Sequence, residues 1–128
     1  MKKQIATSEA PQAVGPYSQA VGAGGFIFVS GQIPLDTATG TIVEGDIKTQ
    51  AGRIFKNISA ILEEAGLGFP DVVSATVFLT DIEDFAAVNQ VYGEYFKGGV
   101  LPARSAVQIC ALPKGARLEI SCVAFDEK

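Results

Sequence analysis

The chain contains one apolar stripe, over residues 47–65, that only a helix can place on a single face. Apolar side chains recur there every three or four residues, the spacing of one side of an α-helix, at Ala51, Ile54, Phe55, Ile58, Ile61, Leu62 and Ala65. Gly66 follows the stripe, and glycine commonly ends a helix because it adopts the left-handed conformation without strain. A helix with one apolar side needs a partner layer, so a sheet is expected to pack against it.

The segments around this helix predict a second helix and a sheet. Residues 80–83, Thr-Asp-Ile-Glu, have the spacing of a capping box and are expected to begin a helix that runs to about residue 96. Its expected apolar side consists of Phe85, Val88, Tyr92, Tyr95 and Phe96. Strands are expected at residues 3–6, 17–23, 26–30, 72–79, 103–110 and 117–125, with a hairpin turn at Gly24-Gly25. This order predicts an α+β architecture, in which two helices cover one face of a single sheet.

The chain is expected to form one domain, residues 1–128, that associates with copies of itself. A length of 128 residues fits a single domain. The sequence offers no third helix for the second face of the sheet. Hydrophobic residues make up 48% of the chain, and the mean hydropathy of +0.28 is high for so small a protein. We therefore expect a dimer or trimer that buries the second face.

Composition excludes several classes of chemistry. The chain has no histidine, which excludes a Ser-His-Asp triad, a Cys-His dyad and metal sites built on imidazole. Its net charge is −4 and its basic residues are scattered, so neither nucleic acid nor an anionic membrane is an expected partner. No phosphate loop, dinucleotide fingerprint or apolar run of membrane-spanning length occurs. We expect a cytoplasmic protein in which Cys110 and Cys122 are reduced thiols.

Arg104 is the first candidate site residue. It lies in the otherwise uncharged stretch 101–107. A guanidinium there must pair with an internal carboxylate or receive an anion from outside, and its planar fork matches a carboxylate with two hydrogen bonds. The residues alone leave both alternatives open.

Glu119 is the second candidate, within the apolar segment 118–123. It is either a solvated or arginine-paired strand carboxylate, or a group that holds a water and acts as acid or base. A simple hairpin centred on Pro113-Lys114 would put Glu119 nearly opposite Gln108 and about 13 Å from Arg104. A substrate could then lie between the two charges.

Four weaker candidates accompany these two charges. Tyr17 at a strand start is typical of packing with a bonded hydroxyl, and Ser30-Gly31 is either a plain turn or a place where a ligand approaches the backbone. Asn89 on the second helix is either a cap for a nearby loop or a site residue. Cys110 lacks a histidine partner and is not expected to act as a nucleophile.

Several short motifs together resemble the RidA family, also called YjgF or liver perchloric-acid-soluble protein. They follow one another along essentially the whole chain without a large insertion. They are Ile5-Ala6-Thr7, Ala13-Val14-Gly15-Pro16-Tyr17-Ser18-Gln19-Ala20, Val29-Ser30-Gly31-Gln32-Ile33-Pro34, Pro102-Ala103-Arg104-Ser105, Leu112-Pro113-Lys114-Gly115 and Leu118-Glu119-Ile120.

The resemblance implies a chorismate-mutase-like α+β fold and a homotrimer whose sheets face inward, with ligand clefts between subunits. It also implies an enamine/imine deaminase that needs no cofactor or metal. Such an enzyme hydrolyses 2-iminobutanoate and 2-iminopropanoate, reactive products of pyridoxal-phosphate enzymes, to 2-keto acids and ammonia.

The resemblance also assigns roles by position. Arg104 would clamp the substrate carboxylate and Glu119 would position the attacking water. Tyr17, Ser30, Gly31, Asn89 and backbone groups at Ala106 would line the pocket. Ala106 departs from the family pattern, which has a cysteine two residues after the arginine. This difference puts regulation by thiol modification in doubt and could change the substrate range.

Three other functions are compatible with the same residues. A non-catalytic protein that binds 2-keto acids or amino acids would use the same arginine, and only turnover separates it from an enzyme. Some relatives are called translation inhibitors or ribonucleases, although the charge and the lack of histidine argue against RNA here. A chaperone that holds clients on apolar surface is the third alternative.

Overall fold

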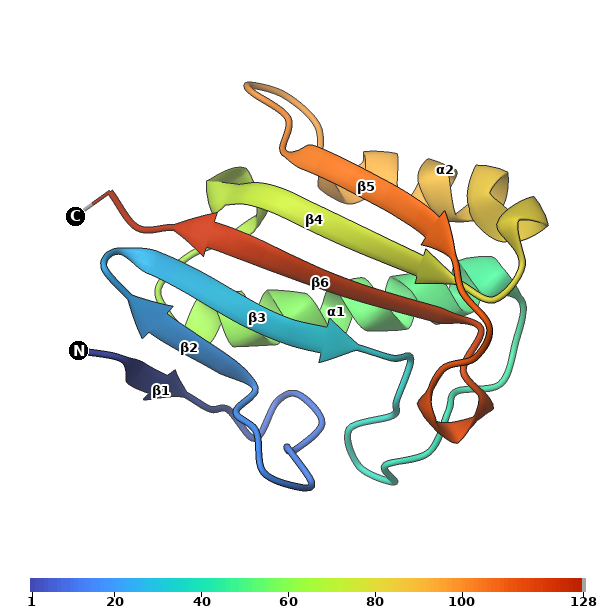
Figure 1. Cartoon of the computed structure of the whole chain (residues 1–128), viewed down its shortest axis with the longest axis horizontal. Helices are drawn as coiled ribbons and strands as arrows, with labels where there is room; N and C mark the ends of the chain where they lie inside the picture. The colour runs from blue at the N-terminus through green and yellow to red at the C-terminus, as the bar shows by residue number, and fades with distance from the viewer. Residues whose placement is uncertain (128) are drawn as a thin grey trace.

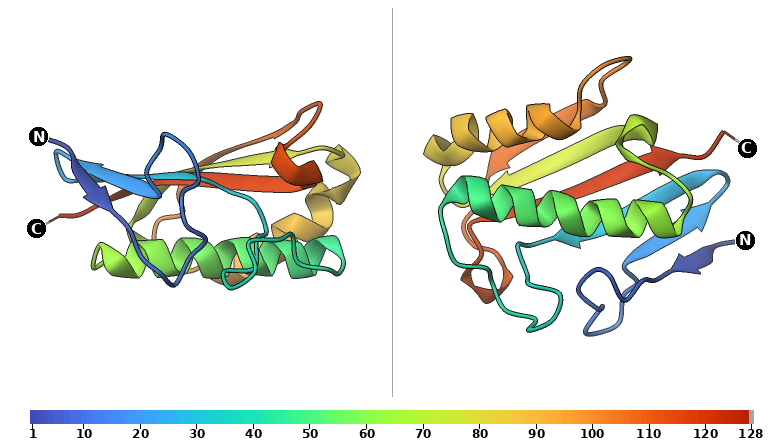
Figure 2. Two further views of the ribbon diagram at one scale, coloured as in Figure 1. Left: turned by 90° about the horizontal axis from the view of Figure 1, so that it is seen from below. Right: turned by 180° about the vertical axis from the view of Figure 1, so that it is seen from behind.

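The computed structural model describes residues 1–127, which form a single mixed sheet with two helices. In chain order the elements are β1 (Lys3–Ile5), β2 (Ala20–Ala23), β3 (Phe26–Gln32), α1 (Ile47–Glu64), β4 (Val72–Leu79), α2 (Phe85–Tyr95), β5 (Ala103–Gln108) and β6 (Leu118–Phe125). The sheet order is β1-β2-β3-β6-β4-β5 (Figure 1). Both helices lie on the same side of the sheet (Figure 2), which confirms the expected α+β layer pair.

Helix α1 forms where the apolar stripe predicts it. The Asp46 carboxylate accepts a hydrogen bond from the Thr49 N–H at 2.9 Å and caps the first turn. Gly66 follows the last turn with a φ of +76°. Six positions of the stripe are at most 1% exposed and form the centre of the core: Ala51, Ile54, Phe55, Ile58, Ile61 and Leu62.

Helix α2 begins differently from the sequence prediction. The cap is Asp81, one residue after the predicted Thr80, and its carboxylate accepts from the Glu83 N–H at 2.9 Å. The capped residues form a short 3₁₀ turn, Ile82–Asp84, that leads into α2. Aspartate and threonine both serve as helix caps, so residue type alone does not distinguish Asp81 from Thr80. The position at which the chain leaves β4 determines which of the two caps the helix.

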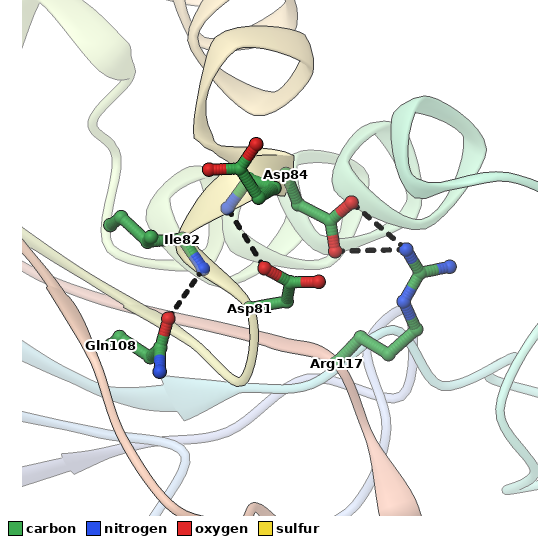
Figure 3. A network of polar contacts seen from close by, with 6 residues as sticks. Asp81, Ile82, Asp84, Gln108 and Arg117 are labelled. Carbon is green, nitrogen blue, oxygen red and sulfur yellow. Dashed lines mark hydrogen bonds and ion pairs between the residues drawn. The ribbon is translucent and has the colours of Figure 1, made fainter.

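Two tertiary contacts fix this start of α2 against the sheet (Figure 3). One Arg117 guanidinium nitrogen contacts both carboxylate oxygens of Asp84, at 2.8 and 3.0 Å. The Ile82 N–H donates to the Gln108 side chain at 2.8 Å. Since Gln108 ends β5 and Arg117 precedes β6, the two contacts set the position of α2 relative to both strands.

The predicted hairpin between the last two strands is wrong. β5 lies at the edge of the sheet and pairs with β4 in parallel, whereas β6 lies between β3 and β4 and is antiparallel to both. Parallel neighbours need a crossover connection, which α2 supplies between β4 and β5. The turn at Pro113–Gly115 therefore carries the chain from the edge of the sheet to its centre.

The N-terminal part of the sheet agrees with prediction except at residues 17–19. β2 and β3 pair through the Gly24-Gly25 turn, where both residues have positive φ, 60° and 87°. Residues 17–19 lie in a loop instead of a strand. The buried Gln19 amide holds this loop, because it accepts from the Thr7 N–H at 2.7 Å and donates to the Pro11 carbonyl at 2.8 Å.

The two faces of the sheet differ in what covers them. The helices bury one face, on which Ala75, Val77 and Leu79 are at most 2% exposed. Phe28 is 49% exposed and alternates along β3 with the buried Ile27 and Val29, and Val107 is 42% exposed and in register with Phe78. Both therefore lie on the face without helices, which is turned to the viewer in Figure 1. The expected association of copies through this open face stays a prediction.

Candidate active site

Arg104 lies on β5 and faces helix α2. Its Cα is in register with that of Ala75, so its side chain leaves the sheet on the helix face. The guanidinium carbon lies 4.7 Å from the ring centre of Tyr92 and 5.2 Å from that of Phe85. One guanidinium nitrogen donates to the Asn89 side-chain oxygen at 2.6 Å. Three residues of α2 therefore hold one arginine.

The Arg104 guanidinium is available to an anion. Within residues 1–127 the recorded ion pair joins Arg117 to Asp84, so no internal carboxylate neutralises Arg104. Pairing of Arg104 with a carboxylate of its own chain is therefore not seen among these residues, and binding of an external anion stays a prediction. A guanidinium has five N–H donors, and the bond to Asn89 uses one of them.

Backbone groups beside Arg104 extend this binding surface. The Ile109 N–H donates to the Leu79 carbonyl at 2.8 Å. This bond shows that the backbone groups of Ile109 point toward β4. Along a parallel strand the direction alternates from one residue to the next, so the N–H and C=O of Ala106, three residues earlier, point away from β4 to the outer edge of the sheet. Side chain and backbone together offer several donors to a carboxylate.

Glu119 lies on the opposite face of the sheet. Its Cα is in register with that of Phe78, and its neighbours Leu118 and Ile120 are buried on the helix face. No donor or cation among residues 1–127 contacts its carboxylate. Burial raises the pKa of Glu119 above its ordinary value of 4.5. A half-buried carboxylate without a partner is suited to hold a water and to accept a proton.

Ser30 and Gly31 form the surface against which Glu119 packs. A β-bulge between Val29 and Gln32 places both residues beside the start of β6. A Cβ atom added to Gly31 would lie 2.5 Å from a Glu119 carboxylate oxygen, so only glycine leaves room for this carboxylate. The Ser30 hydroxyl donates to the Ser18 carbonyl at 2.6 Å.

Tyr17 belongs to the loop that reaches Ser30. The Ser30 N–H donates to the Gln19 carbonyl at 2.9 Å, which joins the loop to β3. Tyr17 itself is 54% exposed, so the expected packing role is wrong for the single chain.

The candidate residues thus divide into two groups on opposite faces of one chain. Arg104, Asn89 and Ala106 lie on the helix side of the β5 edge, and Glu119 lies with Ser30 and Gly31 on the open face. Arg104 and Glu119 are three residues and two strands apart, or about 14 Å between Cα atoms. A substrate that lies between the two charges therefore has to contact two chains, and its place there stays a prediction.

The sequence prediction missed the roles of Phe85 and Tyr92 in this site. The sequence places both on the apolar side of the second helix, and only the pairing of β5 with β4 brings Arg104 over their rings. A signal was present, because residues 85, 89 and 92 are spaced along one side of a helix.

Other chemistry finds less support in the described residues. Residues 1–127 hold no group of three or more histidine, cysteine or acidic side chains that could bind a metal ion. Cys122 is buried, which raises the pKa of its thiol to about 12, whereas Cys110 is exposed. None of the helices in this part of the chain is long and apolar enough to cross a membrane.

Comparison with known proteins identifies close relatives over nearly the full length. Residues 7–126 match the family model described as Endoribonuclease L-PSP. The chain is 54% identical over 126 residues to a RutC family protein of Pyrococcus abyssi, with 98% of each chain covered. It is 49% identical over 124 residues to the 2-iminobutanoate/2-iminopropanoate deaminase of Rattus norvegicus, covering 97% of this chain and 90% of that protein. The structure of E. coli TdcF with bound serine is 43% identical, with a TM-score of 0.92 and coverage of 98% and 99%.

Proposed function

Because the chain belongs to the RidA family, whose model carries the description Endoribonuclease L-PSP, we propose that it hydrolyses 2-imino acids to 2-keto acids and ammonia. The substrates are 2-iminobutanoate and 2-iminopropanoate or their enamine forms, the compounds named in the rat relative. The observation that carries this proposal is the unneutralised Arg104 guanidinium at a sheet edge with free donors beside it.

Arg104 binds the carboxylate that all these substrates share. Its free N–H groups and the outward backbone N–H of Ala106 can reach carboxylate oxygens at the edge of β5. A charged hydrogen bond of this kind fixes the orientation of the adjacent C=N group. The serine in the TdcF structure supports a ligand class of small amino-acid-like carboxylates.

Glu119 supplies the water. The Glu119 carboxylate accepts a proton from water while the water oxygen adds to the imine carbon, and the resulting carboxylic acid returns this proton to the imine nitrogen. In the amino alcohol, Glu119 moves the hydroxyl proton to the nitrogen in the same way, so that the C–N bond breaks, ammonia leaves and the C–O bond becomes the keto group. An imine carbon is already electrophilic, so orientation and one base are sufficient, and the reaction needs no cofactor.

A complete site requires two copies of the chain. Since Arg104 and Glu119 face opposite sides of one sheet, a substrate that touches both must lie between the β5 edge of one copy and the Glu119 side of the next. A homotrimer with inward-facing sheets would repeat this contact around its axis and would also cover exposed residues such as Phe28. The cytoplasmic location expected from the sequence stays a prediction.

The test is release of 2-keto acid from an imine generated by a threonine or serine dehydratase. The wild type is expected to accelerate release, Arg104→Ala to abolish the acceleration, and Arg104→Lys to retain little because it lacks the planar fork. Lys56→Ala, on the exposed side of α1, is the control for loss of one positive charge. No acceleration by folded wild type with several precursors would contradict the proposal.

The same wild-type and Arg104→Ala proteins distinguish the deaminase activity from two other functions. The wild type could bind amino acids or keto acids without turnover, as the serine-bound relative allows. In that case calorimetry should detect binding of 2-oxobutanoate or serine, and the wild type should not accelerate the release of keto acid. The family description names an endoribonuclease, so RNA cleavage that Arg104→Ala removes would favour that activity instead.

A further inference from the structure

Helix α2 presents a shaped surface to Arg104. Phe85, Asn89 and Tyr92 occupy positions separated by four and three residues, which lie on one side of a helix. Both rings are within 5.2 Å of the guanidinium carbon, within the range of a cation–π contact, and Asn89 accepts a hydrogen bond from the same group.

Packing fixes the Tyr92 ring. Tyr92 is 8% exposed, and its ring centre lies 4.5 Å from that of Phe96 and 6.0 Å from that of Phe55. Its hydroxyl is buried and has no hydrogen-bond partner. The ring face is therefore the part of Tyr92 that contacts a functional group, and the hydroxyl contributes no bond.

Without contacts to α2, the Arg104 side chain would be flexible. It is an exposed residue on an edge strand, where a long side chain samples many rotamers. Binding of an anion would have to suppress those rotamers. Contacts made before the ligand arrives reduce that entropic cost, and they leave the outer donors of the fork unpaired.

We propose that Tyr92, assisted by Phe85, is a positioning residue that holds the Arg104 guanidinium ready for a carboxylate ligand. The ligand class rests on the proposed function, but the support of Arg104 is a property of this chain alone. Tyr92 itself does not touch the substrate. Its substitution should therefore weaken ligand binding and leave the chemical step nearly intact.

The test compares Tyr92→Leu and Tyr92→Phe with the matched control Tyr95→Leu. Tyr95 is one turn further along α2 and stacks on Phe55 at 4.7 Å, so its loss damages the same aromatic core without touching Arg104. Tyr92→Phe keeps the ring and removes only the unpartnered hydroxyl. Circular dichroism and size-exclusion chromatography establish that each variant folds and assembles.

Ligand binding is the first readout. Tyr92→Leu should raise the Kd for 2-oxobutanoate, and the KM for imine, by about tenfold, with kcat changed by less than about threefold. Tyr92→Phe should restore the wild-type values, and Tyr95→Leu should stay within about twofold of them. Equal weakening by both leucine variants, or a fall in kcat without a change in Kd or KM, would overturn the proposal.

The second readout does not depend on activity. The Arg104 side-chain N–H signal, identified by its loss in Arg104→Lys, should show an upfield ring-current shift in nitrogen-15 NMR spectra. This shift should shrink in Tyr92→Leu and persist in Tyr92→Phe and Tyr95→Leu. A signal at the position of a free arginine in the wild type would refute the support of Arg104. If the wild type neither binds nor hydrolyses these ligands, the proposed function fails, and this signal still decides the positioning role.

Discussion

The side chains of Arg104 and Glu119 leave the sheet on opposite faces. Arg104 is in register with the buried Ala75 and rests on α2, whereas Glu119 is in register with Phe78 and packs against Gly31 on the side without helices. A sheet one layer thick separates the two charges within a chain. A reaction that uses both therefore has to bring together two chains.

This geometry predicts that two inactive variants restore activity to each other. When Arg104→Ala and Glu119→Gln chains are mixed in equal amounts, unfolded and refolded together, some contacts combine an intact Arg104 with an intact Glu119. Random assembly into a ring gives such a contact in about one quarter of cases, so about one quarter of the wild-type activity should return.

The control for this mixing experiment is each variant refolded alone, which should stay inactive. Different affinity tags on the two variants establish that mixed assemblies have formed. Mixed assemblies without any activity would show that Arg104 and Glu119 do not act at one shared site.

Gly31 is expected to control the position of the Glu119 carboxylate. In Gly31→Ala the new Cβ would lie 2.5 Å from a carboxylate oxygen, and the flexible end of the glutamate would move away. Activity should fall by about tenfold or more, because displacement of a catalytic group by an ångström has a large effect on rate. Stability should change little, because no backbone or buried atom has to move. Keto-acid release and urea unfolding measure the two effects.

Gly52→Ala is the matched control. Apart from the surrounding helix backbone, no atom lies within 4 Å of a Cβ added at Gly52, which is in the interior of α1. Alanine there should raise the free energy of unfolding by about 0.5–1 kcal/mol and leave activity unchanged. Equal activity in both alanine variants would argue against a role for the Glu119 position.

How far the sequence predicts the molecule depends on whether an interaction is local. The stripe of α1, its end at Gly66 and the Gly24-Gly25 turn are all encoded within a few neighbouring residues, and each is confirmed. The pairing of β6 with β3 and β4 joins segments far apart in the sequence, and the predicted hairpin fails there.

The candidate site shows the same limit. Arg104 and Glu119 are visible in the sequence because a charge within an apolar segment needs an explanation. Their faces depend on strand pairing, so their separation was not predictable. The aromatic contacts of Arg104 depend in addition on the placement of α2 by Asp84 and Arg117.

Glu119 should make stability depend on pH. Burial raises the pKa of Glu119 in the folded chain above 4.5, so the unfolded chain releases this proton first as the pH rises. The favourable contribution is complete below the unfolded pKa and is lost as the pH rises through the folded pKa. The free energy of unfolding of Glu119→Gln minus that of the wild type should therefore be larger above this pH window than below it. Urea unfolding at one protein concentration over a series of pH values measures the difference, and parallel curves would contradict it.

The two thiols should react at very different rates. A thiol reagent attacks the thiolate, and burial raises the pKa of Cys122 to about 12, so almost no thiolate is present there at about pH 8. Cys110 is exposed, so the reagent reaches its sulfur directly. Ellman's reagent should therefore label one thiol per folded chain quickly, and label both in denaturant. Cys110→Ser should abolish the fast phase, and a fast phase that survives would mean that the core around Cys122 opens readily.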